Sequence, residues 1–117
     1  MSSQQAALKP ADLASYIDHT ILAPDAEPDV VARLCEEAQA YGFRSVCVNP
    51  VYVPQVAAAL AGSAVRACSV ICFPLGAMPT ELKAAEAEWV VAQGAEEVDM
   101  VIPVGLLKNK QFDCVRQ

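Results

Sequence analysis

The feature that most constrains the fold is a repeated alternation between short runs of β-branched residues and longer segments with helical spacing. The short runs lie at residues 16–22, 44–48, 65–73 and 97–103, and they are rich in Val, Ile, Thr and Cys. Nearly continuous apolar runs of this length are typical of parallel strands that are covered on both faces. The sequence therefore predicts four strands in a parallel sheet.

The first two segments between these runs predict helices. Residues 29–41 carry apolar side chains at helical spacing, among them Leu34 and Ala38. Gly42 follows directly and is the expected C-terminal stop of this helix. Residues 53–60 predict a second, shorter helix.

The third helix has the clearest pattern. Thr80 is its expected N-terminal cap, and Gly94 is expected to end it. Leu82 and Trp89 lie on one side at helical spacing, which predicts that both pack in the core. A further short helix is expected after Gly105.

The resulting order, β-α-β-α-β-α-β with short connections, predicts a parallel sheet with right-handed crossovers. Periodicity alone does not separate an open, doubly wound sheet from part of a barrel. Neither GxGxxG after the first strand nor GxxxxGK[ST] occurs, so the two common nucleotide-binding motifs lose support.

Composition removes several classes of function. The net charge is −6 with no cluster of Lys or Arg, which argues against a nucleic-acid partner. No apolar run approaches the roughly 20 residues of a membrane span, and no secretory signal is evident. The five cysteines are odd in number and mostly inside apolar runs, which suits free thiols in a reducing cytoplasm better than disulfides. With no CxxC and a single histidine, His19, we expect no zinc site. We expect no other metal and no cofactor.

Polar residues interrupt three of the predicted strands. Asp18 and Thr20 lie in the first, Cys47 in the second and Asp99 in the fourth. Side chains alternate along a strand with a period of two, so Asp18 and Thr20 share a face. If those faces line a barrel, Asp18, Cys47 and Asp99 point into one interior.

Each of these residues also has a structural interpretation. An ionised carboxylate among apolar neighbours is costly unless it is paired, so Asp99 is either functional or satisfies backbone amides at a strand end. Asp18 and Thr20 suit an ordinary strand end, where such side chains bond local backbone. Cys47 suits a small buried hydrophobe more than a nucleophile. His19 should face the helices as a packed structural residue.

At these residues the sequence resembles the deoxyribose-phosphate aldolases. The matching blocks occur in family order and with family spacing over residues of about 13–110. They are residues 17–24, 34–38, 41–50, 52–53, 69–76, 81–83, 94–102 and 105–108. Each block alone is weak evidence, and the ordered set is specific.

The resemblance implies a (β/α)₈ barrel and a metal-free class I aldolase, of which this chain holds the first four βα units. Such enzymes reversibly cleave 2-deoxy-D-ribose 5-phosphate to acetaldehyde and glyceraldehyde 3-phosphate through a lysine Schiff base. Asp99 matches the family's proton-transferring aspartate, and Asp18, Thr20 and Cys47 match positions that line its substrate pocket.

The resemblance also implies what this half of the barrel lacks. The Schiff-base lysine, the relay lysine and the phosphate loops belong to later strands, and Lys9, Lys83, Lys108 and Lys110 are expected to be solvated. We therefore divide the chain into an N-terminal extension (1–12), a partial barrel (13–110) and a divergent end (111–117), and we expect it to be inactive alone. Open sheet edges and an apolar inner face predict aggregation, self-association or pairing with a missing half. The alternatives are a non-catalytic half barrel that docks on itself or on a full-length aldolase, and an unrelated α/β domain.

Overall fold

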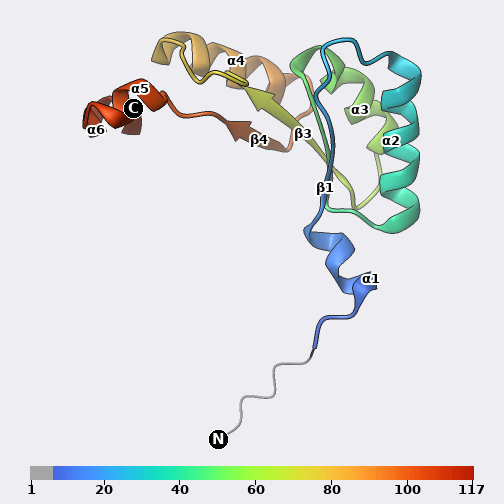
Figure 1. The fold of residues 1–117 in the computed structure, drawn as a ribbon. Coiled ribbons are helices and arrows are strands. Elements are labelled where there is room, and N and C mark those ends of the chain that lie inside the picture. The colour runs from blue at the N-terminus through green and yellow to red at the C-terminus, as the bar shows by residue number, and fades with distance from the viewer. Residues whose placement is uncertain (1–6) are drawn as a thin grey trace, which may run out of the picture.

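The computed structural model describes residues 7–117, which form one parallel sheet with helices packed on one of its faces (Figure 1). The strands are β1 (Asp18–Ile21), β2 (Ser45–Val48), β3 (Arg66–Ile71) and β4 (Glu97–Met100). The α-helices are α1 (Pro10–Leu13), α2 (Pro28–Tyr41), α3 (Val53–Leu60), α4 (Thr80–Ala92), α5 (Val104–Lys108) and α6 (Phe112–Arg116). Two 3-10 turns, Ala14–Tyr16 and Pro50–Tyr52, precede β1 and α3.

The sheet has the order β1-β2-β3-β4, and every pairing is parallel. Strands that follow the chain order with a helix in each connection are the arrangement of a (β/α) barrel, and here the sheet is open at β1 and at β4. The radius of gyration is 16.8 Å, against about 13 Å for a compact domain of this length. The difference reflects an unclosed sheet from which α5 and α6 extend beyond β4 (Figure 1).

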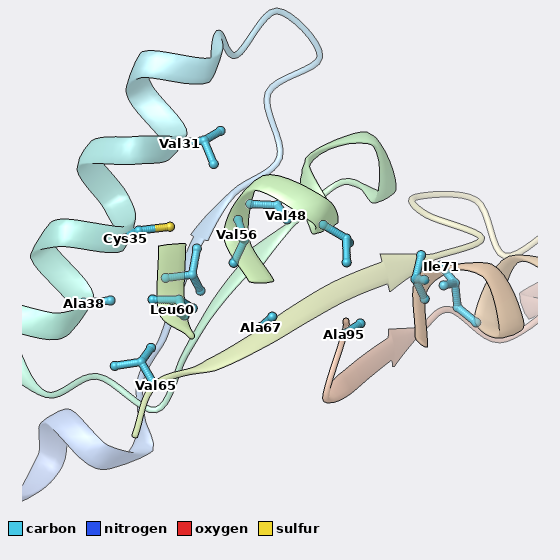
Figure 2. Close-up of a cluster of buried hydrophobic side chains, with 13 residues drawn as sticks. Val31, Cys35, Ala38, Val48, Val56, Leu60, Val65, Ala67, Ile71 and Ala95 are labelled. Atoms are coloured by element: carbon cyan, nitrogen blue, oxygen red, sulfur yellow. The ribbon is translucent and has the colours of Figure 1, made fainter. Parts of the chain in front are cut away.

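The core lies between the sheet and the helices α2, α3 and α4. Figure 2 shows Val31 and Cys35 of α2 pointing toward Val56 and Leu60 of α3. Val46 and Val48 of β2 complete this layer from the sheet, and both are fully buried. Apolar side chains at alternate strand positions and at helical spacing therefore meet in one layer, as their periods predict.

The ends of α2 show how local sequence sets an element. Pro28 begins the helix, where its missing N–H costs nothing. Gly42 ends it in the left-handed conformation, with φ of 69°, and its N–H donates to the carbonyl of Ala38. The predicted stop at Gly42 is confirmed, and so are the bounds of the second predicted helix, which is α3.

Several expectations about the elements are wrong. Thr80 does not cap α4: it is the first helical residue, Pro79 is the N-cap, and no side chain bonds the helix start. Leu82 and Trp89 are 54% and 47% exposed, because α4 turns Val90 into the core and leaves these two on its flank. The helices α1 and α6 were not expected from the sequence.

The strands are also less covered than predicted. β2 and most of β3 are buried, but β1 alternates between exposed and half-buried residues and β4 is mostly exposed. Helices cover only one face, and the edge strands lack a neighbour on one side. Within residues 7–117, no helix combines the length and the apolar character that crossing a membrane requires.

Candidate functional site

The strand register places the candidate residues on one face of the sheet. Asp18 pairs with Ser45, Thr20 pairs with Cys47, Cys47 pairs with Cys68, and Val70 pairs with Asp99. Register partners on neighbouring parallel strands project to the same side. We call this side the open face. It comprises Asp18, Thr20, Ser45, Cys47, Arg66, Cys68, Val70, Glu97 and Asp99.

The predicted gathering of Asp18, Cys47 and Asp99 on one face is therefore present. An unrelated domain that placed them on separate surfaces is not what the chain forms. The expectation that this face is apolar is wrong. It carries Asp18 of β1 and Glu97 and Asp99 of β4 on either side of a small apolar patch from β2 and β3.

Asp18 is held by a neighbour that sequence reasoning did not single out. The Ser45 hydroxyl, fully buried, donates to Asp18 Oδ1 over 2.7 Å. Thr20 Oγ1 donates to the backbone carbonyl of Asp18 over 2.7 Å. Both bonds are local or between adjacent strands, so they fix the start of β1 and orient the carboxylate. Sequence reasoning missed Ser45 because only the register of β1 against β2 shows that it lies beside Asp18.

Asp99 lies near the C-terminal end of β4 and is exposed. We expected a carboxylate enclosed by apolar residues, and this is wrong for the open sheet. Its neighbours Val98 and Met100 point to the other face, where they are 38% and 54% exposed. With water at hand, the ionised carboxylate carries no large burial cost here.

Glu97 gives the open face its charge pairing. Glu97 Oε1 lies 3.0 Å from Arg44 Nε and 4.0 Å from Arg66 Nη1. These pairs are at the N-terminal end of the sheet, away from the strand ends where parallel α/β proteins place their active sites. They tie the starts of β2, β3 and β4 together.

The apolar patch of the open face is built from Cys47, Cys68 and Val70, with Leu22 packed against it. A hydrogen bond from Cys68 lowers the pKa of the Cys47 thiol, while burial and the carboxylates of Asp99 and Asp18 act in the opposite direction. The same contact with Cys47, together with burial, raises the pKa of Cys68. Cys68 is buried, as its position in the third apolar run predicts, but its contact with Cys47 was not anticipated.

His19 points away from the open face, as expected. Its Nε2 lies 2.7 Å from Glu37 Oε2 on α2, and its ring packs on Phe43 with centroids 5.0 Å apart. Both partners belong to the helix-covered side. His19 is a packed structural residue here.

No lysine of the described chain lies on the open face. Lys9, Lys108 and Lys110 are exposed and lie outside the strands. Lys83 differs from the expectation of a solvated side chain: it is half-buried, and its Nζ donates to the carbonyl of Val101 over 3.1 Å. That contact is on the helix side of β4.

Lys83 borders a cavity of about 380 Å³ between α4 and the α5–α6 segment. Its wall is apolar, with Ile71, Met100 and Ile102 among the contributing residues. None of the sequence-predicted site residues lines it. Among residues 7–117, no group of three or more His, Cys, Asp or Glu side chains is placed to hold a metal ion.

The sequence of this chain is similar to those of known proteins. No family model matches the chain. It is 59% identical over 106 residues to the deoxyribose-phosphate aldolase of Rhodospirillum rubrum, covering 91% of this chain and 44% of the relative. The Clostridium tetani aldolase of the same name is 49% identical over 106 residues, with 91% and 49% covered.

A solved structure agrees with these relatives. The tetrameric deoxyribose phosphate aldolase of Aeropyrum pernix superimposes with a TM-score of 0.79 at 44% identity, over 84% of this chain and 42% of that one. The four βα units thus correspond to part of a (β/α)₈ barrel. This chain spans about half the length of the curated relatives that it matches, and over that length it is similar to deoxyribose-phosphate aldolases.

Proposed function

We propose that this chain supplies the N-terminal half of a deoxyribose-phosphate aldolase. The reaction is the reversible cleavage of 2-deoxy-D-ribose 5-phosphate to acetaldehyde and glyceraldehyde 3-phosphate. The observation that carries the proposal is the open face, where Asp18, Thr20, Cys47 and Asp99 from three strands lie together. Thr20, Cys47 and Asp99 are each the third residue of a four-residue strand, toward the C-terminal ends where a parallel barrel forms its active site, whereas Asp18 begins β1.

In this proposal Asp99 is the proton-transferring residue. A lysine amine from the other half of the barrel attacks the substrate carbonyl carbon, and water leaves as the Schiff base forms. The carboxyl group of Asp99 then gives and takes protons at the reacting centre.

Asp18, Thr20 and Cys47 form the pocket wall in the same proposal. Asp18 is already oriented by Ser45, so its second carboxylate oxygen is free to accept from a substrate hydroxyl. Cys47 presents an apolar surface beside Cys68 and Val70.

The segment boundaries at residues 12 and 110 remain predictions, as does a cytoplasmic setting for the reaction.

We further propose that residues 1–117 alone catalyse no retro-aldol reaction. The support is the placement of the lysines: the described ones lie outside the open face, and none projects from a strand into an apolar pocket where desolvation would activate it. The experiment is a chimera in which this chain replaces the matching half of the Rhodospirillum rubrum aldolase. The chimera should turn over deoxyribose 5-phosphate, and the 117-residue chain should not.

Within the chimera, Asp99→Asn should lower turnover by about 10²–10⁴-fold, the usual contribution of a general acid or base. Asp113→Asn is the matched control, because Asp113 lies on α6 with its side chain 97% exposed, and it should leave turnover unchanged. Full activity of the Asp99→Asn chimera would refute the assigned role.

The runner-up is a non-catalytic half barrel that associates with itself or with a full-length aldolase. Its support is the pair of open edges, β1 and β4, whose backbone groups lack a neighbouring strand. Size-exclusion chromatography of the chain, with and without the intact Rhodospirillum rubrum enzyme, separates the two. A stable complex that leaves the enzyme's turnover unaltered would favour the interaction protein.

A further inference from the structure

Two thiols lie side by side on the open face. Cys47 of β2 and Cys68 of β3 are register partners on adjacent parallel strands, so both side chains project to the same side. Neighbouring strands run about 4.8 Å apart. A disulfide needs its two Cα atoms about 4.4–6.8 Å apart and its Cβ atoms facing one another. This pair therefore meets the Cα requirement without movement of the strands.

The surroundings of the pair admit a small reagent and little else. Cys47 and Cys68 are 3% and 4% exposed, and they form one apolar cluster with Val70, against which Leu22 packs. No helix of the described chain packs over the open face, and Thr20 and Asp99 beside the pair are exposed. A molecule the size of hydrogen peroxide can approach the sulfurs from this side, whereas a large thiol reagent is hindered.

The other cysteines are set apart from this pair. Cys35 lies in the core on α2, on the opposite face of the sheet. Cys72 follows the end of β3 with φ of 51°, and Cys114 is exposed on α6. All five are free thiols in this structure.

The two thiols are also chemically unequal. The hydrogen bond from Cys68 lowers the pKa of Cys47 and so favours its thiolate, which is the form that attacks a peroxide. Burial and the contact with Cys47 raise the pKa of Cys68, which therefore stays protonated. The Cys47 sulfur is therefore suited to be oxidised first. The sheet holds the Cys68 sulfur beside it, where it can react with the oxidised Cys47.

We propose that Cys47 and Cys68 form a two-electron redox pair that hydrogen peroxide converts into a disulfide joining β2 to β3. The Cys47 thiolate attacks one peroxide oxygen, the O–O bond breaks, and the other oxygen leaves as water after taking a proton. The Cys68 sulfur then attacks the sulfenic sulfur of Cys47, the S–O bond breaks, and a second water leaves with the thiol proton. In sum, two thiols and one hydrogen peroxide give one disulfide and two waters.

The proposal stands independently of the aldolase assignment. It requires the β2–β3 register and an accessible open face, and it needs neither a substrate nor the rest of the barrel. Where the chain does serve an aldolase, the disulfide would consume Cys47, which the proposed pocket uses as an apolar wall.

The test is peptide mapping of the purified chain after treatment with hydrogen peroxide. Free thiols are blocked with iodoacetamide in denaturant, and the protein is digested with trypsin without reduction. Cleavage after Arg44, Arg66 and Lys83 places Cys47 in peptide 45–66 and Cys68, together with Cys72, in peptide 67–83. The expected product is a 45–66/67–83 pair lighter than the sum of the two by two hydrogen atoms, and it is lost on reduction.

Variants identify the sulfurs. The linked pair should persist in Cys72→Ser and Cys35→Ser and disappear in Cys68→Ser. Fragmentation of the linked peptides from the unaltered chain identifies the bonded sulfurs even if a variant fails to fold. The link should also form at least about tenfold faster than in the chain unfolded in urea, because the sheet holds the sulfurs together.

Three outcomes would overturn the proposal. In the first, Cys47 and Cys68 are still free and become alkylated, although the peroxide has oxidised the exposed Cys114. In the second, the disulfide uses Cys72. In the third, the disulfide forms no faster in the folded chain than in the unfolded one.

Discussion

The two faces of the sheet are built from the same four strands but differ in burial and in the residues that they carry. On the helix-covered face, Val46 and Val48 are fully buried against Val31 and Val56. On the open face, Asp18 and Asp99 are exposed, although Asp18 lies one residue from the packed His19. Alternation along β1 and β2 therefore separates most of the core packing from the candidate residues. Substitutions on the two faces should have correspondingly different effects.

The sharpest contrast is between two leucines. Leu60 on α3 is 4% exposed in the core, and Leu82 on α4 is 54% exposed. Leu60→Ala should lower the free energy of unfolding by about 2–5 kcal/mol, because it leaves a cavity against the covered face. Leu82→Ala removes the same atoms from a solvated site and should cost within about 0.5 kcal/mol. Urea denaturation monitored by circular dichroism measures both, and equal losses would break the comparison.

A buried hydrogen bond makes Asp18 an exception on the open face. Asp18→Ala leaves the fully buried Ser45 hydroxyl without its acceptor, which should cost about 1–3 kcal/mol. Asp25→Ala, in an exposed turn, is the matched control and should be close to neutral. The double variant Asp18→Ala/Ser45→Ala should recover part of the loss, because neither partner is then unsatisfied. No recovery would show that Asp18 stabilises β1 by another route.

The ion pair at the N-terminal end of the sheet should contribute less to the free energy of unfolding. Arg44 and Glu97 are 3.0 Å apart, but the Arg44 side chain is 45% exposed, so water and salt screen the pair. Arg44→Gln should lower the unfolding free energy by at most about 1 kcal/mol, and the difference should shrink in concentrated salt. A loss that salt leaves unchanged would indicate lost packing of the Arg44 chain instead.

Asp99 should give the smallest effect on stability. Its carboxylate is exposed in this chain, so Asp99→Asn should change the unfolding free energy by less than about 0.5 kcal/mol. The same substitution is expected to be severe for turnover in the chimeric enzyme. A large stability loss in the isolated chain would mean that Asp99 has a structural partner and would weaken its assignment to chemistry.

Local rules were enough to predict most of the fold. Four apolar runs gave four strands, Gly42 ended α2, and a period of two placed Asp18 and Thr20 on one face. Each of these inferences needs only neighbours along the chain. The family resemblance then selected a partial barrel over an open doubly wound sheet, which periodicity could not do.

The predictions that failed all depend on contacts between residues that are far apart in the sequence. Trp89 has the spacing of a core residue, yet only the angle at which α4 meets the sheet decides that Val90 is buried instead. Asp99 has apolar neighbours along the chain, yet it is exposed because β4 is an edge strand and no helix of the described residues covers this face. The pairing of Cys47 with Cys68 needed the register between two strands, which no local pattern supplies.

The central proposal is that this chain carries the pocket wall and Asp99 but no lysine able to form the Schiff base. The most direct test is borohydride trapping with deoxyribose 5-phosphate, in which the intact mass of the protein is measured. The Rhodospirillum rubrum enzyme, treated in the same way, is the positive control. Borohydride reduces an imine to a stable amine, so any reactive lysine retains the substrate. We predict no added mass on the 117-residue chain while the control is labelled. A substrate-sized increase on the chain would contradict the account and identify Lys9, Lys83, Lys108 or Lys110 as a working nucleophile.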